Sequence, residues 1–315
     1  MVNPRLEHDI RQLTAILSLL NVKGLGPVKF RSIYEQLNSF YRVFDLSEDD
    51  IRNRFKFHEN IAKGILAQKN NLQKFEETAK NQLEEANQLN AHLITYFDEE
   101  YPRNLYNSNH SVPIIYVLGN LSILKNEKCC AVVGTRKPLD WTKKEIKVAV
   151  EKLVSENFTI VSGLALGVDE IAHSTAIEND GKTIAVVGCG VDFPYPRQNY
   201  VLRNKIVENG AIISEYPFGT KVLVFGLKKR NKIIVGLSKH VLVTQTSEKG
   251  GTMNAYRAAL EQKKPVGIFY PPRFLRKQFD GNLKILKDGK IPVLKFASGK
   301  DVNFSRDIHV QSVLV

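Results

Sequence analysis

The chain has 315 residues and a mass of 35.6 kDa, and it is 43% hydrophobic and 25% charged. Its net charge is +12 and its isoelectric point lies near 9.4, which favours a polyanionic partner, nucleic acid first. No run approaches the roughly 20 unbroken apolar residues of a membrane span, and the N-terminus lacks the pattern of a signal peptide, so we expect a cytoplasmic protein without a membrane contact. Three cysteines are too few for a disulfide framework and match no zinc-site spacing, so no metal is expected.

The first part of the chain is predicted to be helical. Apolar residues recur at helical spacing over residues 13–37, around a break at Gly24–Pro27, and again over residues 60–89. The break resembles the hairpin of a helix-hairpin-helix unit, whose N–H groups can hold one DNA phosphate, although a plain helical turn gives the same pattern. We therefore expect a small N-terminal helical domain of the helix-hairpin-helix or SAM-like kind.

The pattern changes after this region. Short apolar runs such as HLITYFD and VPIIYVLG are typical of strands, and from Cys129 onward strands and helices alternate. The runs are continuously apolar, as in parallel strands that are buried on both faces. The sequence therefore predicts an α/β fold with a Rossmann-like, doubly wound, mostly parallel sheet. Its predicted divisions are a helical domain at 1–87, the sheet domain at 88–297 and a loose tail at 298–315.

Three glycine-containing loops, VVGTRKP, VSGLALGVD and VVGCGVDFPYP, each follow a predicted strand. In open α/β sheets ligands bind beyond the carboxyl ends of the strands, where glycines let backbone N–H groups approach an anion. Tight turns alone would also explain these glycines. The residues predicted to bind phosphate in the first two loops are Gly134, Thr135, Arg136, Ser162 and Gly163.

Signatures of catalysis and of nucleotide cofactors are missing. There is no G-x-x-x-x-G-K-[ST] element, and Gly188-x-Gly190 lacks the third glycine of a dinucleotide fingerprint, so no cofactor is expected. Asp169 and His173, four residues apart, form a possible acid/base pair on one helix face. The interpretation we favour is helix construction, with Asp169 at the positive helix end and His173 bonded to the loop. We therefore expect a protein that is not an enzyme.

The densest basic run lies at residues 228–232. Such a run usually forms a solvated face, but beside Arg136 it would follow a phosphate backbone. Phe218 and Phe225 lie nearby and could stack on bases, with core packing the usual alternative. The run contributes the DNA-binding candidates Lys228, Lys229, Arg230, Asn231 and Lys232, and secondary candidates are Lys221, Phe225, Gly250, Gly251 and Thr252.

These motifs, taken in order, resemble the DNA-processing protein A (DprA, or Smf) family. The resemblance runs from the helical region to about residue 296. It rests on the blocks YFDEEYPRNL, VPIIYVLGN, VVGTRKP, VSGLALGVDEIAHSTA, TIAVVGCGVDFPYPRQN, IISEYPFGT, RNKIIVGLS and FDGNLKILKDG.

The resemblance implies an extended Rossmann-like fold without a nucleotide cofactor, binding and protection of single-stranded DNA, loading of a RecA-type recombinase in transformation or recombination, and a homodimer. The chain departs from the family where Phe-Pro-x-Arg-Asn-Arg reads LKKRNK, with Leu227 and Lys228 in place of the aromatic and the proline. The family's Ser-Gly-Ser segment reads GGTMNAY, and no winged-helix domain follows the sheet. These differences indicate a divergent member.

Two alternatives stay open. Residues 249–252 resemble the Gly-Gly-x-Gly-Thr loop of phosphoribohydrolases that look like lysine decarboxylases, which suggests a sensor or hydrolase of nucleotide derivatives. Ala255 stands at the place of their catalytic glutamate, which argues against hydrolysis. A protein-interaction scaffold with a solvated basic face is the second alternative.

Overall fold

The computed structural model describes residues 4–304. Its N-terminal part is a helical lobe, in which Pro27 opens one helix and Gly24, at φ +86°, makes the preceding turn. Ser47 and Asp50 form a capping box that starts another helix. The helices of the lobe are α1 (Pro4–Leu19), α2 (Pro27–Leu37), α3 (Glu48–Phe55), α4 (Glu59–Gln68) and α5 (Leu72–Leu89), with 3₁₀ turns at Tyr41–Asp45 and Lys69–Asn71.

The rest of the molecule is built around a nine-stranded sheet, whose strands lie in the spatial order β1-β2-β6-β5-β4-β3-β7-β8-β9. The strands from β6 to β9 are parallel, whereas the β1–β2 and β2–β6 pairs are antiparallel. The strands are β1 (Ala91–Thr95), β2 (Ile114–Gly119), β3 (Cys129–Val133), β4 (Thr159–Ser162), β5 (Thr183–Val186), β6 (Ala211–Ser214), β7 (His240–Val243), β8 (Val266–Phe269) and β9 (Val293–Phe296). This confirms the predicted Rossmann-like, mostly parallel α/β fold and its preceding helical region.

Both faces of the sheet are buried, which explains the continuous apolar runs. In β3, Cys130 and Val132 belong to a core cluster with the helices that follow β3 and β4, while Ala131 and Val133 belong to the larger cluster on the other face. The helices of this part are α6 (Arg103–Tyr106), α7 (Asp140–Ser155), α8 (Val168–Glu178), α9 (Tyr200–Asn209), α10 (Val224–Lys229), α11 (Asn231–Leu237), α12 (Thr252–Glu261) and α13 (Asp280–Asp288).

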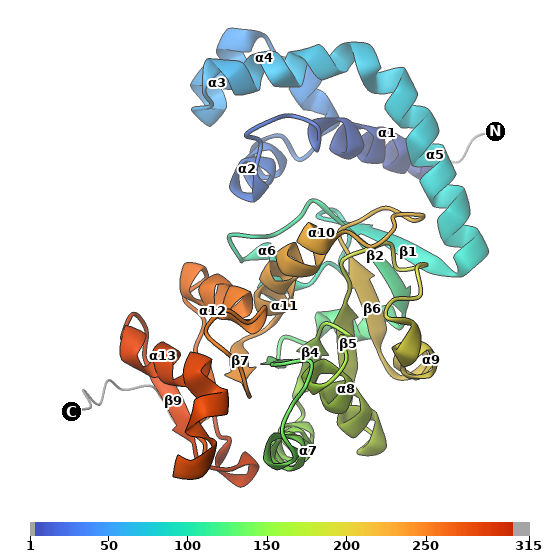
Figure 1. Cartoon of the computed structure of the whole chain (residues 1–315). Coiled ribbons are helices and arrows are strands. Elements are labelled where there is room, and N and C mark those ends of the chain that lie inside the picture. The colour runs from blue at the N-terminus through green and yellow to red at the C-terminus, as the bar shows by residue number, and fades with distance from the viewer. Residues whose placement is uncertain (1–3, 305–315) are drawn as a thin grey trace.

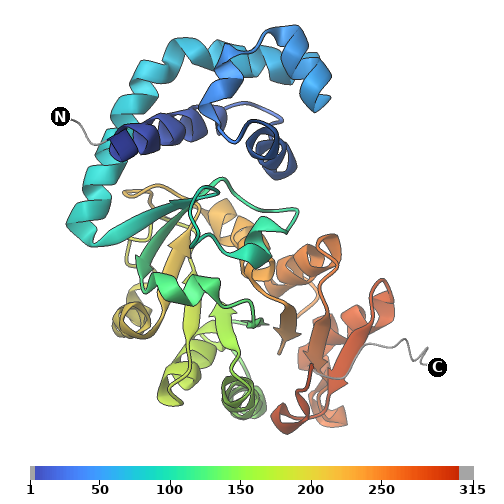
Figure 2. The ribbon, with the colours of Figure 1, turned by 180° about the vertical axis from the view of Figure 1, so that it is seen from behind.

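The chain direction across the sheet reverses between β3 and β7. Strands β3 to β6 progress toward one edge, and β7 then returns to pair with β3 before β8 and β9 continue toward the other edge. Figures 1 and 2 show the helical lobe above the part of the body that holds β1, β2 and α10, with β9 and α13 at the far end. The reversal is a topological switch point, where α/β sheets bind their ligands.

The predicted loose tail is wrong for residues 298–304. Gly299–Asp301 form a 3₁₀ turn against α7, where the Gly299 N–H donates to Glu145. Val302 is fully buried, and the Phe304 ring stacks on His240 with 4.5 Å between ring centroids. These contacts anchor the chain beyond β9, a strand that the sequence reasoning did not anticipate. The remainder of the predicted tail lies outside the described residues. Within residues 4–304, no helix has the length and apolarity to cross a bilayer.

Candidate nucleic-acid interface

A cavity of about 530 Å³ opens at the switch point, beyond the carboxyl ends of β3, β4 and β7. We call it the carboxyl-edge cavity. Segments that are far apart in the sequence meet here: the loops after these three strands, the α10–α11 junction and the first turn of α12. It is lined by Val133, Gly134, Thr135, Arg136, Ala165, Asp169, Tyr195, Val224, Leu227, Lys228, Arg230, Asn231, Thr246, Ser247, Gly250, Gly251, Thr252, Asn254 and Ala255.

The loop after β3 places Arg136 at the rim of this cavity. Thr135 is fixed by backbone hydrogen bonds on both sides, from its N–H to Gln245 and from the Val168 N–H to its carbonyl. Gly134 is required for this close approach, because a Cβ there would lie 2.4 Å from the Thr244 hydroxyl. Arg136 follows with an exposed side chain that forms no ion pair within residues 4–304. Its guanidinium is therefore available to an anion from outside.

A buried ion pair forms the floor of the cavity. The Arg230 guanidinium lies 3.2 Å from the Asp169 carboxylate, and the two side chains are 8% and 7% exposed. Gly163 makes room for it, since a Cβ at that position would lie only 1.6–1.9 Å from guanidinium atoms. Burial lowers the pKa of Arg230, and repulsion from nearby Arg136 lowers it further, while Asp169 raises it. The Arg230 Nε–H has no hydrogen-bond partner among the described residues. Because Arg136, Lys228 and Arg230 line the cavity with Asp169 as their acidic neighbour, an anionic ligand there would balance the excess of positive charge.

Only part of the predicted basic run faces the carboxyl-edge cavity. Lys228 and Arg230 line it, together with Asn231, whose amide donates to the Gly251 carbonyl at 3.4 Å. Lys229 pairs with Glu215, and Lys232 pairs with Glu261 at 3.4 Å. DNA binding by these two lysines stays a prediction from the sequence. Neither lysine lines the cavity: Lys229 is the last residue of α10, and Lys232 lies in the first turn of α11.

The predicted hydroxyl donor of the second loop is also wrong. Ser162 is fully buried, and its hydroxyl donates to the Val132 carbonyl on the neighbouring strand at 2.6 Å. The hydroxyl thus joins β4 to β3 inside the sheet. Gly163 contributes by seating Arg230.

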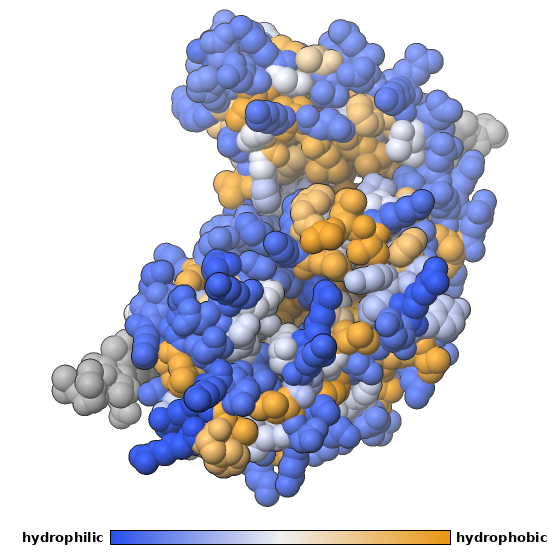
Figure 3. Space-filling view, viewed as in Figure 1, coloured by the Kyte–Doolittle hydropathy of each residue, from blue (hydrophilic) through white to orange (hydrophobic). Residues whose placement is uncertain are grey.

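The secondary candidates divide in the same way. Gly250, Gly251 and Thr252 line the cavity at the start of α12, whereas Lys221 and Phe225 do not. Phe225 is 59% exposed, and its ring lies beside that of Tyr216. Figure 3 shows an apolar patch over α10, the helix to which Phe225 belongs. Phe218 packs in the core against Tyr116. The sequence reasoning missed Tyr195 and the pair Thr246–Ser247, although small polar residues directly after a strand were an available signal.

Asp169 and His173 do not form an acid/base pair. His173 is fully buried and its Nδ1 lies 2.6 Å from the Thr183 hydroxyl, which itself donates to the Ile160 carbonyl. The Thr183 oxygen must therefore accept, so Nδ1 carries the proton. Nε2 has no partner among the described residues, and burial together with the Arg230 charge lowers the pKa of His173 to about 3.

This histidine predicts a loss of stability in weak acid. The imidazole has a pKa near 6.5 in the unfolded state and about 3 in the folded state. Below pH 6.5 the unfolded state therefore binds a proton that the folded state does not bind, and the free energy of unfolding should fall as the pH drops. Between pH 6.5 and 4.5 the loss should be roughly 2.5 kcal/mol, measurable by urea unfolding at both pH values. A His173→Gln variant should lose less over the same interval, and an identical loss in the two proteins would contradict the assignment.

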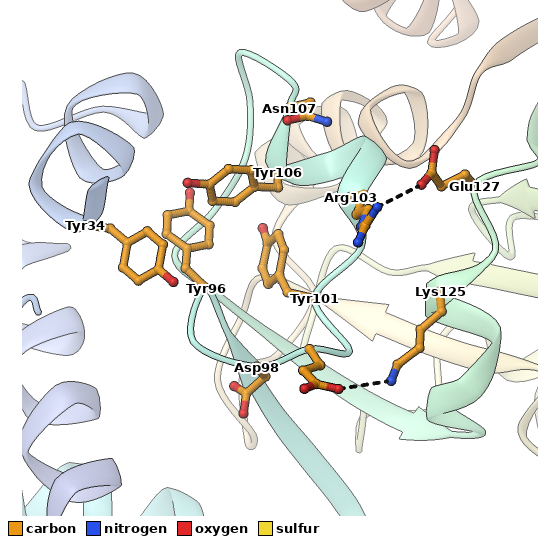
Figure 4. A pocket seen from close by; sticks show the side chains of 10 residues that line it. Tyr34, Tyr96, Asp98, Tyr101, Arg103, Tyr106, Asn107, Lys125 and Glu127 are labelled. Carbon is orange, nitrogen blue, oxygen red and sulfur yellow. Dashed lines mark ion pairs between the residues drawn. The ribbon is translucent and has the colours of Figure 1, made fainter. Parts of the chain in front are cut away.

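A second cavity of about 840 Å³ lies away from this site, between α2 and the segments after β1 and β2 (Figure 4). Its cations are already paired, Arg103 with Glu127 at 3.9 Å and Lys125 with Glu99 at 3.9 Å. Asp98 adds a third carboxylate, so this tyrosine-rich cavity is less suited to a polyanion than the carboxyl-edge cavity. Its other lining residues are Tyr34, Tyr96, Tyr101, Tyr106 and Asn107.

Comparison with known families decides what kind of protein carries this site. Residues 92–299 match the family described as DNA recombination-mediator protein A. The chain belongs to this family. Among its relatives, Protein Smf of Synechocystis is 35% identical over 256 residues, which are 79% of this chain and 62% of that protein. DNA processing protein DprA of Streptococcus pneumoniae is 35% identical over 209 residues, 66% of this chain and 72% of that protein.

Solved structures of the family show the same fold. The X-ray structure of DNA processing protein A from Streptococcus pneumoniae superposes with a TM-score of 0.70 at 27% identity, over 92% of this chain and 96% of that one. A structure of the Helicobacter pylori protein, reported for its single-stranded DNA binding mode, has a TM-score of 0.58 at 28% identity, over 64% of this chain and 90% of that one. This member of the DNA recombination-mediator protein A family therefore shares the fold over nearly its whole described length.

Proposed function

We propose that this family member binds single-stranded DNA, with the phosphate backbone at the carboxyl-edge cavity. The observation that carries the proposal is the meeting of three cations there: exposed Arg136, rim residue Lys228 and buried Arg230 with its unpartnered Nε. The backbone N–H of Gly251, directly before the first turn of α12, offers a further donor to a phosphate. The net charge of +12 and the DNA binding mode reported for the Helicobacter pylori relative support the same proposal.

We further propose that the protein acts without catalysis. Among the described residues, Asp169 is the only acidic side chain that lines the carboxyl-edge cavity, and it is neutralised by Arg230. Within residues 4–304, no histidine or cysteine lines the cavity, and Ala255 stands where the similar loop of the phosphoribohydrolases would place a glutamate. A general base is therefore lacking among the lining residues. From the family resemblance we further propose that the protein protects single-stranded DNA, delivers it to a RecA-type recombinase and forms a homodimer. The division of the chain near residues 87 and 297, inferred from the sequence pattern, also remains a proposal.

A salt titration tests DNA binding. Three phosphate contacts predict a slope of log K against log [salt] of about −2, so affinity for a labelled oligothymidylate should fall roughly 20-fold between 50 and 200 mM salt. The measurement is fluorescence anisotropy, with the same titration on a duplex of equal length for comparison. Absence of binding even at 50 mM salt would contradict the proposed function and leave the scaffold alternative.

A further inference from the structure

The tyrosine-rich cavity between the helical lobe and the sheet has walls of two kinds. Figure 4 shows tyrosines gathered on one side of it and two ion pairs on the other, Arg103 with Glu127 and Lys125 with Glu99. Its volume of about 840 Å³ is enough for a side chain of another molecule or for a small organic compound. The tyrosines come from α2, from the loop after β1 and from α6, and they are Tyr34, Tyr96, Tyr101 and Tyr106.

The four tyrosine rings form one cluster, in which the centroids of neighbouring rings lie between 5.0 and 6.3 Å apart. Tyr96 and Tyr101 are 5% and 6% exposed and form its buried part, whereas Tyr34 and Tyr106 are half-buried. The hydroxyls of Tyr96, Tyr101 and Tyr106 already donate hydrogen bonds to other partners. The cluster therefore offers the cavity mainly ring surface, and the faces of such rings carry negative electrostatic potential.

Asp98 adds a negative charge beside these rings. Its Oδ2 accepts hydrogen bonds from the Thr95 N–H and hydroxyl at 2.7 and 2.9 Å, which fixes the position of the carboxylate. Within residues 4–304, Asp98 forms no ion pair and its Oδ1 accepts no hydrogen bond. Burial raises the pKa of Tyr34, and the Asp98 charge raises it further, so this charge acts on the nearby ring. On the tyrosine side of the cavity, Asp98 thus has no cation to balance it.

The chain's own Arg31 shows which cation such groups bind. Its Cζ lies 5.8 Å from the centroid of the Tyr106 ring, and its Nη1 donates to the Tyr106 carbonyl at 2.6 Å. Its Nε lies 3.7 Å from the Glu35 carboxylate. A guanidinium is the cation that both stacks on an aromatic ring and matches the shape of a carboxylate. Tyr34 and Asp98 offer a ring and a carboxylate to the cavity in the same way, without a guanidinium between them.

From this juxtaposition we infer that the tyrosine-rich cavity binds an organic cation, namely a guanidinium group carried on a short apolar chain. The guanidinium stacks on the half-buried rings of Tyr34 and Tyr106 and donates to Oδ1 of Asp98. It comes either from an arginine side chain of another polypeptide or from a free guanidino compound. The inference does not rest on DNA binding, because this cavity shares no lining residue with the carboxyl-edge cavity.

The test is a titration of the whole chain, with isotope-labelled tyrosine rings followed by NMR. One ligand is a blocked glycine–arginine–glycine peptide, and the other is the same peptide with citrulline, which has nearly the same shape but no charge. The arginine peptide should shift the ring signals with a Kd of roughly 1 mM, and the citrulline peptide should bind at least about tenfold more weakly. Agmatine distinguishes the two sources: affinity equal to that of the peptide indicates a free guanidino compound, and weaker binding indicates a polypeptide.

Substitutions locate the binding site. Tyr34→Leu should weaken binding of the arginine peptide roughly tenfold, whereas Tyr34→Phe, which keeps the ring face, should stay within about twofold. Asp98→Asn should weaken binding about fivefold, since it removes the charge but keeps an acceptor for Thr95. The matched control is Tyr200→Leu at an exposed tyrosine on α9, which should change nothing. The Tm of each variant shows that it folds, and Asp98→Asn carries the test if Tyr34→Leu does not.

Three results would overturn the inference. The first is equal affinity for the arginine and citrulline peptides, and the second is the absence of any shift of tyrosine signals at about 10 mM arginine peptide. The third is a loss in Tyr34→Phe as large as that in Tyr34→Leu, because the hydroxyl and not the ring face would then hold the ligand. None of these results bears on DNA binding, which the salt titration tests separately.

Discussion

An Arg230→Ala variant should unfold about 3–5 kcal/mol more easily than the unchanged protein, because it leaves the Asp169 carboxylate buried without its counter-charge. The side chains of the pair are 8% and 7% exposed, so water cannot replace the lost partner. Urea unfolding followed by circular dichroism measures the difference. The same variant should lose most of its affinity for single-stranded DNA, since Arg230 is the buried cation of the carboxyl-edge cavity.

A double variant separates the charge effect from a general loss of packing. Asp169→Leu combined with Arg230→Met replaces both ions by apolar groups of similar length and should recover most of the lost stability, although not the DNA binding. The exposed salt bridge between Glu59 and Lys63 serves as the control: Lys63→Ala should leave the free energy of unfolding nearly unchanged. If Arg230→Ala costs less than about 1 kcal/mol, the ion pair is solvated and the buried site described above is wrong.

Two lysines four residues apart in the same run should behave differently toward DNA. Lys228→Ala should weaken binding of single-stranded DNA about tenfold and reduce the salt slope by about 0.7, the loss of one phosphate contact, and Arg136→Ala should do the same. Lys232→Ala should stay within about twofold, because its ammonium is paired with Glu261 and does not line the cavity. The measurement is anisotropy at several salt concentrations with strands of different sequence.

The comparison within one run makes this a strict test. Lys228 and Lys232 share residue type, formal charge and near-identical sequence position, so a protein that binds DNA through its net charge alone would respond equally to both substitutions. An equal loss for the two variants would therefore contradict the carboxyl-edge cavity as the DNA site. It would favour diffuse attraction to the basic surface.

The fold was largely predictable from the sequence because its signal is local. A buried parallel strand is a short, continuously apolar run, and CCAVV and TIVS show this directly. Strand β9 was not anticipated, since VLKF is short and carries a lysine among its apolar residues. Residues 298–304 look like a polar tail, and only the distant partners His240 and Glu145 reveal that they pack.

The site was predictable as a set of loops but not in its detail. Glycines after strands identified where the ligand edge lies. The directions of side chains depend on partners far away in the sequence, and Glu215 and Glu261 draw two lysines of the basic run away from the cavity. In the same way, the Ser162 hydroxyl is occupied by a carbonyl of the next strand. Pairings of this kind follow from the tertiary structure, which periodicity and composition do not encode.

The absent side chain of Gly163 has a consequence for how this protein can be altered. Any replacement at position 163 must displace the guanidinium that lies on it, and the displaced cation would abandon Asp169. Substitutions at positions 163, 169 and 230 are thus coupled, because a change at any one of them disturbs the ion pair or the space that holds it. In a saturation library, tolerance at position 163 should appear only in backgrounds where both ionic partners have already been exchanged. Sequence diversification around the carboxyl edge should accordingly proceed by coordinated triple replacement rather than by single steps.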